Sequence, residues 1–234
     1  MRARLACASL TIALVVVGLT IVVPAAGAAD ECKGLRVCLP ISGPWVVIPA
    51  GGVEYELACP AGYIVAGTDV RVATRDIDVS FRGESGSPVG PGVTTRRSVV
   101  FEAVRTLVSA GPSSFRPFIG CIPTQGGGGR ALTSVSAASP GVKPTQPVRG
   151  VVASRRVRSR SFVVRVACPS GSRLIGSSHA VAFRQRLSPS DAMLTAVSVS
   201  RAVVGRAVVA RVESTTIAGP RAEVQVRALC ARAK

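Results

Sequence analysis

Two five-residue stretches decide the fold: Ala58-Cys59-Pro60-Ala61-Gly62 and Ala167-Cys168-Pro169-Ser170-Gly171. They lie 109 positions apart, and in each case the next cysteine follows 62 positions after the first, at Cys121 and at Cys230. Three further matches share the same offset: Gly67 with Gly176, Val72-Ala73 with Val181-Ala182, and Val99-Val100 with Val208-Val209. The chain is therefore predicted to contain two tandem copies of one structural unit.

The first 29 residues have the pattern of a secretory signal peptide. Arg2 and Arg4 precede an uncharged apolar run over residues 5–23, and Pro24 and five small residues follow it. We expect cleavage just before Ala29 or Asp30, which makes the product a secreted, extracellular protein. The alternative is a tether to the membrane by the uncleaved segment, because a run of this length is close to the roughly 20 residues that span a bilayer.

Six cysteines remain after the signal, which carries Cys7, has been removed. Thiols pair in the oxidising environment outside the cell. The equal spacing predicts that Cys59 pairs with Cys121 and Cys168 with Cys230, which leaves Cys32 to pair with Cys38 across a short loop. Because all six cysteines are then used, we expect no metal site of the Cys/His kind. We also expect no cofactor.

Within each copy the apolar residues alternate with polar ones, as in a β-strand with one buried face. Ile77, Val79 and Phe81 follow this pattern, and so do Val224, Val226 and Ala228. We predict an all-β protein of two tandem antiparallel sandwich or barrel-like units, each with about five to seven strands and one disulfide. The predicted parts are the signal (1–29), an N-terminal disulfide loop (30–44), the first repeat (45–123), a Gly/Pro-rich linker (124–149) and the second repeat (150–234).

The Cys-Pro-x-Gly opening, with a further Gly five residues later and a closing Cys, resembles small secreted β domains of high-GC Gram-positive bacteria. The resemblance extends over about 150 residues in the two copies. It implies a compact disulfide-stapled β unit, and it implies no reaction.

The two copies differ in net charge. Residues 30–141 carry 10 basic and 9 acidic residues, whereas residues 142–234 carry 17 basic and 3 acidic ones. Arg155, Arg156, Arg158 and Arg160 form the densest cluster and are the candidate residues for an anionic ligand.

The positive charge of the second copy would attract an anionic cell-wall polymer, a membrane surface or nucleic acid. Sequence-specific recognition of nucleic acid is disfavoured, because aromatic residues that could stack on bases are scarce. No feature identifies a protein partner. The competing interpretation is that arginine-rich composition reflects a GC-rich genome and a solvated outer strand face.

Catalytic groups are few. His179 is the one histidine, and we expect it to be in the core or partly buried because it shares a strand face with Val181 and Phe183. Asp76 and Asp78 could act as a carboxylate pair, but neighbouring arginines make a surface role the better interpretation. We therefore predict a secreted binding or structural protein of the cell exterior without catalytic residues. The alternative is a secreted hydrolase of unknown substrate that uses His179 or the two aspartates.

Overall fold

The protein is almost entirely β-structure. The computed structural model describes residues 30–83, 97–106, 112–124, 148–215, 218–219 and 221–232. Across these residues every strand pairing is antiparallel, and the helical content is one short helix, α1 (Asp191–Leu194). The predicted all-β antiparallel fold is therefore confirmed. The predicted signal and most of the predicted linker lie outside the described residues.

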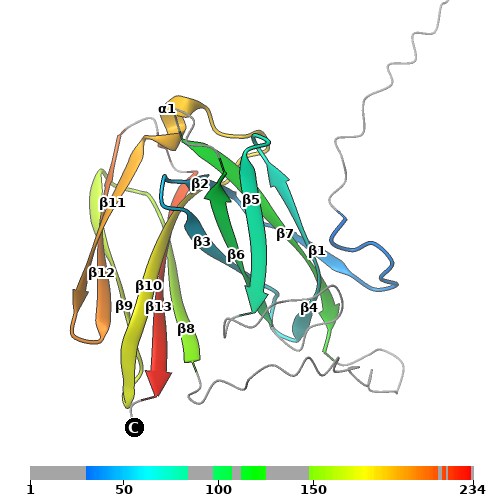
Figure 1. Ribbon diagram of the computed structural model, residues 1–234, viewed down its shortest axis with the longest axis horizontal. Coiled ribbons are helices and arrows are strands. Elements are labelled where there is room, and N and C mark those ends of the chain that lie inside the picture. The colour runs from blue at the N-terminus through cyan, green and yellow to red at the C-terminus, as the bar shows by residue number, and fades with distance from the viewer. Residues whose placement is uncertain are drawn as a thin grey trace, which may run out of the picture.

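The strands fall into two groups along the chain. The N-terminal half, residues 30–124, contains β1 (Leu39–Ser42), β2 (Trp45–Ile48), β3 (Val53–Ala58), β4 (Tyr63–Val72), β5 (Ile77–Gly83), β6 (Ser98–Arg105) and β7 (Ser113–Pro123). The C-terminal half, residues 148–232, contains β8 (Val148–Arg156), β9 (Ser161–Ala167), β10 (Ser172–Phe183), β11 (Val197–Val204), β12 (Ala207–Ser214) and β13 (Ala222–Arg232). Figure 1 shows the two halves side by side.

One seven-stranded sheet runs through both halves. β7 pairs with β1, β2 and β4, and β2 continues the sheet to β10, β13 and β8. The junction between the halves is short: Val46 pairs with Ala182, and Trp45 pairs with Phe183. Each half adds a three-stranded sheet of its own, with the order β3-β6-β5 in the N-terminal half and β11-β12-β9 in the C-terminal half.

Several pairings recur at the offset of 109. β4 pairs with β7 as β10 pairs with β13, and both ladders contain a register shift, between Val65 and Gly67 and between Leu174 and Gly176. Likewise β3 pairs with β6 as β9 pairs with β12. Because a single sheet connects the two halves, the division into two tandem units stays a prediction.

Two strands begin earlier than the predicted boundaries. β1 lies inside the predicted N-terminal loop and pairs with β7 from Leu39 to Ser42. β8 begins at Val148, inside the predicted linker, and pairs with β13. The β1–β2 segment pairs with β7 as β8 pairs with β13, at the offset of 109. It is interrupted at Gly43, where an added Cβ would meet the ring of Pro117. That interruption hides the strand from a search for uninterrupted alternation.

Each half has its own apolar core. Phe101, Phe115 and Ile119 are fully buried in the first core, and Phe183, Val208 and Val212 are fully buried in the second. The disulfides join Cys59 to Cys121 and Cys168 to Cys230, each between the two sheets of its half. The third disulfide joins Cys32 to Cys38. These are the pairs that the spacing predicts.

A buried polar contact holds the halves together. β3 lies across the face of β13 that points away from the second core, where Glu223, Gln225 and Arg227 are at most 6% exposed. The side-chain amide of Gln225 accepts from the backbone N–H of Glu56 at 2.7 Å and donates to its carbonyl at 3.0 Å. Tyr55 donates its hydroxyl to Glu223 at 2.9 Å. The polar groups of this interface are thus paired across the two halves, as burial requires.

Candidate functional site

The predicted arginine cluster lies where β8 ends and β9 begins. Arg155 and Arg156 are the last two residues of β8, and Arg158 and Arg160 lie in the connection to β9. All four are exposed, whereas Val157 between them is buried at 5% exposure. The backbone N–H of Val157 donates to the carbonyl of Ala222 at 2.9 Å. The buried valine fixes the segment, so the arginines beside it are held at the surface.

Strand pairing adds three arginines that are distant in sequence. Arg184 and Arg186 follow β10, and Arg221 precedes β13. The backbone N–H of Arg184 donates to the carbonyl of Arg221 at 2.9 Å, and Arg156 pairs with Glu223 two residues further along β13. β10, β13 and β8 are neighbours in the sheet, so these residues meet at one end of it. We call the set the arginine end: Arg155, Arg156, Arg158, Arg160, Arg184, Arg186 and Arg221.

The arginine end keeps most of its charge unpaired. Its nearest carboxylate, Glu223, is 3% exposed and accepts from Arg184 Nε at 2.6 Å as well as from Tyr55. This contact raises the pKa of Arg184 despite its partial burial, and burial raises the pKa of Tyr55 further above its ordinary value. Among the described residues, the other six guanidinium groups form no ion pair. They are therefore available to an external anion.

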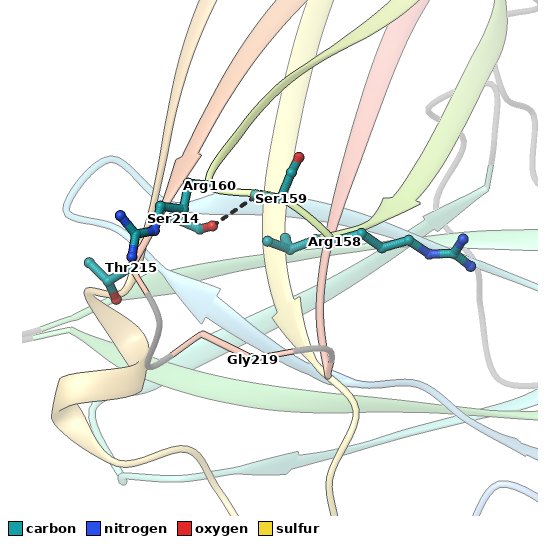
Figure 2. Close-up of a pocket in the computed structure, with 7 residues that line it drawn as sticks. Arg158, Ser159, Arg160, Ser214, Thr215 and Gly219 are labelled. Atoms are coloured by element: carbon teal, nitrogen blue, oxygen red, sulfur yellow. Dashed lines mark hydrogen bonds between the residues drawn. The ribbon is translucent and has the colours of Figure 1, made fainter.

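A surface cavity of about 340 Å³ opens beside Arg158 and Arg160, with Ser214, Thr215 and Gly219 on its other side. Figure 2 shows the guanidinium group of Arg160 beside Thr215, whereas the side chain of Arg158 extends in the opposite direction. The two groups diverge, so they do not converge on one small anion. Their arrangement suits a ligand with several separated negative charges.

The hydroxyl groups around this cavity already donate within the protein. Ser214 Oγ donates to the carbonyl of Ser159 at 3.1 Å, and Ser159 Oγ donates to the carbonyl of Ser161 at 3.1 Å. Thr215 Oγ1 points to the carbonyl of Ala196 at 3.5 Å. The donors left for an anion are therefore the guanidinium groups, which bind phosphate and carboxylate through paired N–H groups.

The residues considered for catalysis differ in their surroundings. Asp76 accepts from Arg105 at 3.0 Å, with both side chains 13% exposed, and Asp78 is exposed on β5. Arg105, which lies 29 positions further along the chain, is thus a partner of Asp76. His179 is partly buried on β10, and burial together with the charge of Arg201 lowers its pKa. Within the described residues, no group of three or more His, Cys, Asp or Glu side chains could hold a metal ion.

Four of the seven arginines at this end are predicted from the sequence, because they form one cluster from Arg155 to Arg160. Arg184, Arg186 and Arg221 are single basic residues in turn regions, and their proximity follows from strand pairing across 37 positions between residues 184 and 221. The matched spacing of the cysteines is the available signal, because Cys168 precedes β10 and Cys230 lies in β13. It does not give the register of the strands, and the register determines which residues meet.

Comparison of the chain with family models, with curated proteins and with solved structures found no match. Across the described ranges, the chain forms no helix of the length and apolar character that a membrane span requires.

Proposed function

We propose that the protein is a secreted, non-catalytic binding protein of the cell exterior that docks on an anionic polymer through its arginine end. One observation carries the proposal: six exposed guanidinium groups, which have no ion-pair partner among the described residues, gather at a single end of the large sheet. Three disulfides in a chain of this size support an oxidising, extracellular setting.

The charge distribution supports docking by one half. In the described part of residues 148–232, 14 of 15 arginines are exposed, and Arg227 is the buried one. The acidic residues there are Asp191, Glu213 and Glu223, the last of which is buried and paired. A field of one sign accelerates association with an oppositely charged polymer and makes the affinity strongly dependent on salt.

The divergence of Arg158 and Arg160 favours a polymer over a single small anion. An extended polyanion presents charges at regular intervals and can contact both groups at once. Each contact displaces a counterion from the polymer, so the number of contacts can be obtained from the slope of affinity against salt concentration.

The test compares two variants of equal charge. In the first, Arg155, Arg156, Arg158 and Arg160 are replaced by Ser; in the second, the exposed arginines Arg165, Arg173, Arg206 and Arg211 are replaced by Ser. Binding to linear polyphosphate, to polyglutamate and to neutral dextran is measured at several salt concentrations. Vesicles that contain an anionic phospholipid form a separate arm, which tests for docking on a membrane surface.

We expect the wild-type protein to bind both polyanions and to ignore dextran. The first variant loses at least tenfold in affinity and its salt slope falls by about 3, at about 0.7 per lost phosphate contact on a flexible strand. The second variant keeps most of its affinity. Equal losses in the two variants would show that net charge alone drives binding, which would contradict a site at the arginine end.

A further inference from the structure

The beginning of the described chain is docked on β4 and β7. The backbone carbonyl of Glu31 lies over Gly67 and Gly120, which are paired across these strands, and a Cβ on either glycine would clash with it. The residue Glu31 is 6% exposed, whereas the side chain of Asp30 is 69% exposed. The chain thus passes from an exposed to a buried position within one residue.

The backbone nitrogen of Asp30 contacts a carboxylate. Its N–H donates to Asp69 Oδ2 at 2.8 Å, and the N–H of Val70 donates to Asp69 Oδ1 at 2.7 Å. Each oxygen of the carboxylate therefore accepts one hydrogen bond, and one of these comes from the nitrogen atom that links Asp30 to Ala29. The pattern of the signal peptide places one of the two expected cleavage sites at this same bond.

Negative charge is concentrated around this contact. Burial raises the pKa of Glu31, and the carboxylates of Asp69 and Asp30 raise it further. Lys33 Nζ lies 3.6 Å from the carboxylate of Asp30, but the lysine side chain is 79% exposed, so water screens its charge. A positive charge at the backbone nitrogen of Asp30 would be close to these carboxylates and would be stabilised by them.

Hydrolysis of the peptide bond creates such a charge. When water adds across the bond between Ala29 and Asp30, Ala29 keeps a carboxylate, and the nitrogen of Asp30 becomes an amine that is mostly protonated at pH 7. The new ammonium group stands where an amide N–H already contacts Asp69. A hydrogen bond between two charged groups is stronger than one from a neutral amide. Cleavage before Ala29 would instead leave a neutral amide at this position.

We propose that the chain is cleaved before Asp30, and that the α-ammonium group formed there makes an ion pair with Asp69 that fastens the N-terminal segment to β4. The cleavage is performed by a peptidase of the export pathway, and this chain supplies the carboxylate that receives the product. The inference rests on export, which is part of the proposed function, but it does not depend on binding of a polyanion at the arginine end.

The first test identifies the N-terminus of the exported protein. The full chain is produced with its own leader in a Gram-positive host, and the exported protein is analysed by intact mass and by N-terminal sequencing. We expect the sequence to begin at Asp30. An exported protein that begins at Ala29, or one that keeps the leader, would overturn the proposal and would leave binding to polyphosphate unaffected.

The second test measures the charge state of the N-terminus. Acetic anhydride reacts with a neutral amine, whereas a neighbouring carboxylate keeps the amine protonated. Asp69→Asn removes the charge but keeps an oxygen that can accept from Val70, and Asp78→Asn removes the same charge at an exposed position on β5. At pH 7 we expect the N-terminus of Asp69→Asn to be acetylated about threefold faster than that of the wild-type protein, and the N-terminus of Asp78→Asn to react at the wild-type rate. The difference should shrink in 1 M salt, which screens exposed charges.

Acetylation also mimics the uncleaved chain, because an acetylated nitrogen is again a neutral amide. In the wild-type protein acetylated at the N-terminus alone, we expect faster hydrogen exchange at residues 31–38 than in the unmodified protein. The same modification should add little in Asp69→Asn, whose ion pair is already lost. Equal acetylation rates of the wild-type protein and Asp69→Asn, or unchanged exchange in the acetylated wild-type protein, would overturn the proposal. If Asp69→Asn does not fold, the N-terminal sequence and the exchange of the acetylated wild-type protein still decide.

Discussion

Arg227 Nη1 lies 3.2 Å from Glu54 Oε2, although the two residues are 173 positions apart and belong to different halves of the protein. Arg227 Nε also donates to Glu56 Oε2 at 3.3 Å. The arginine side chain is 7% exposed, and Ser178 Oγ donates to the same Glu54 oxygen at 2.9 Å. One buried guanidinium group thus neutralises two carboxylates of β3 and joins the halves.

Replacing Arg227 with Ala leaves Glu54 and Glu56 partly buried without this cation. Removal of one partner from a buried ion pair costs several kcal/mol, because the remaining charge is poorly solvated. We expect the free energy of unfolding to fall by about 3 kcal/mol, measured by urea denaturation at pH 7. Arg211→Ala, at an exposed position on β12, is the matched control and should change it by less than about 0.5 kcal/mol. Similar values for the two variants would contradict a central role for Arg227.

Gly67 and Gly176 occupy equivalent positions at the offset of 109 but have different surroundings. A Cβ at Gly67 would clash with the backbone carbonyl of Glu31, which immediately precedes the loop closed by the Cys32–Cys38 disulfide. A Cβ at Gly176 would lie 3.5 Å from Leu229, which is an ordinary contact. The N-terminal loop thus covers one glycine and leaves the other with room.

We expect Gly67→Ala to displace the N-terminal loop and to lower the free energy of unfolding by about 1–3 kcal/mol, the usual cost of overpacking. Gly176→Ala should have an effect below about 1 kcal/mol. Hydrogen exchange at residues 30–38 measures the displacement, and denaturation measures the stability. Equal effects of the two substitutions would mean that the loop does not press on Gly67 in solution.

His179 should make stability depend on pH near neutrality. Burial and Arg201 lower its pKa in the folded protein, whereas the unfolded chain has the ordinary value of about 6.5. As pH falls below about 6.5, the unfolded state binds a proton that the folded state does not, so the folded state loses stability until pH reaches the lowered pKa. The contribution is fully present above about 6.5.

Two measurements check this dependence. The imidazole signals of the one histidine should titrate with a midpoint below 6.5. Urea denaturation at pH 7.5 and 5.5 should show a loss of stability that His179→Leu removes, because leucine binds no proton. A titration midpoint at or above 6.5 would show that His179 is more exposed than its place on β10 implies.

The strands and disulfides follow from local patterns, but the contacts between the halves do not. The alternation of Glu223, Gln225 and Arg227 with Val224 and Val226 predicts β13 correctly. Alternation cannot show that the polar face of the strand is buried, because that depends on β3, about 170 positions away. The polar face of a strand is normally expected to be exposed to solvent. Here β3, whose polar groups complement those of β13, covers that face.

The candidate site, too, follows only in part from local patterns in the sequence. A cluster within six residues, Arg155 to Arg160, is visible in the sequence, and the structure places all four side chains at the surface. Arg184 and Arg221 meet only through the register of β10 and β13. A second cavity, whose lining includes His179, needs residues of both halves, so no local pattern reports it.

The junction of the two halves suggests why β8 ends in arginines. In the N-terminal half, Trp45 and Val46 of β2 pair with Phe183 and Ala182 of β10 and extend the sheet. At the offset of 109, Ser154 and Arg155 of β8 take the places of Trp45 and Val46. β8 is the last strand in the order of the sheet across the described residues, so its outer edge is open to pairing. Charged residues at such an edge oppose pairing with another chain.

Arg155→Val is therefore expected to increase self-association, because it restores the residue type that pairs in the N-terminal half. The edge of β8 in one molecule could then extend the sheet of the next, in a head-to-tail contact that does not close on itself. Light scattering over a range of protein concentrations measures the effect. Arg211→Val adds the same apolar side chain on the exposed face of the central strand β12, away from any edge, and should leave the mass unchanged. Self-association of both variants would attribute the effect to added hydrophobicity rather than to the edge of β8.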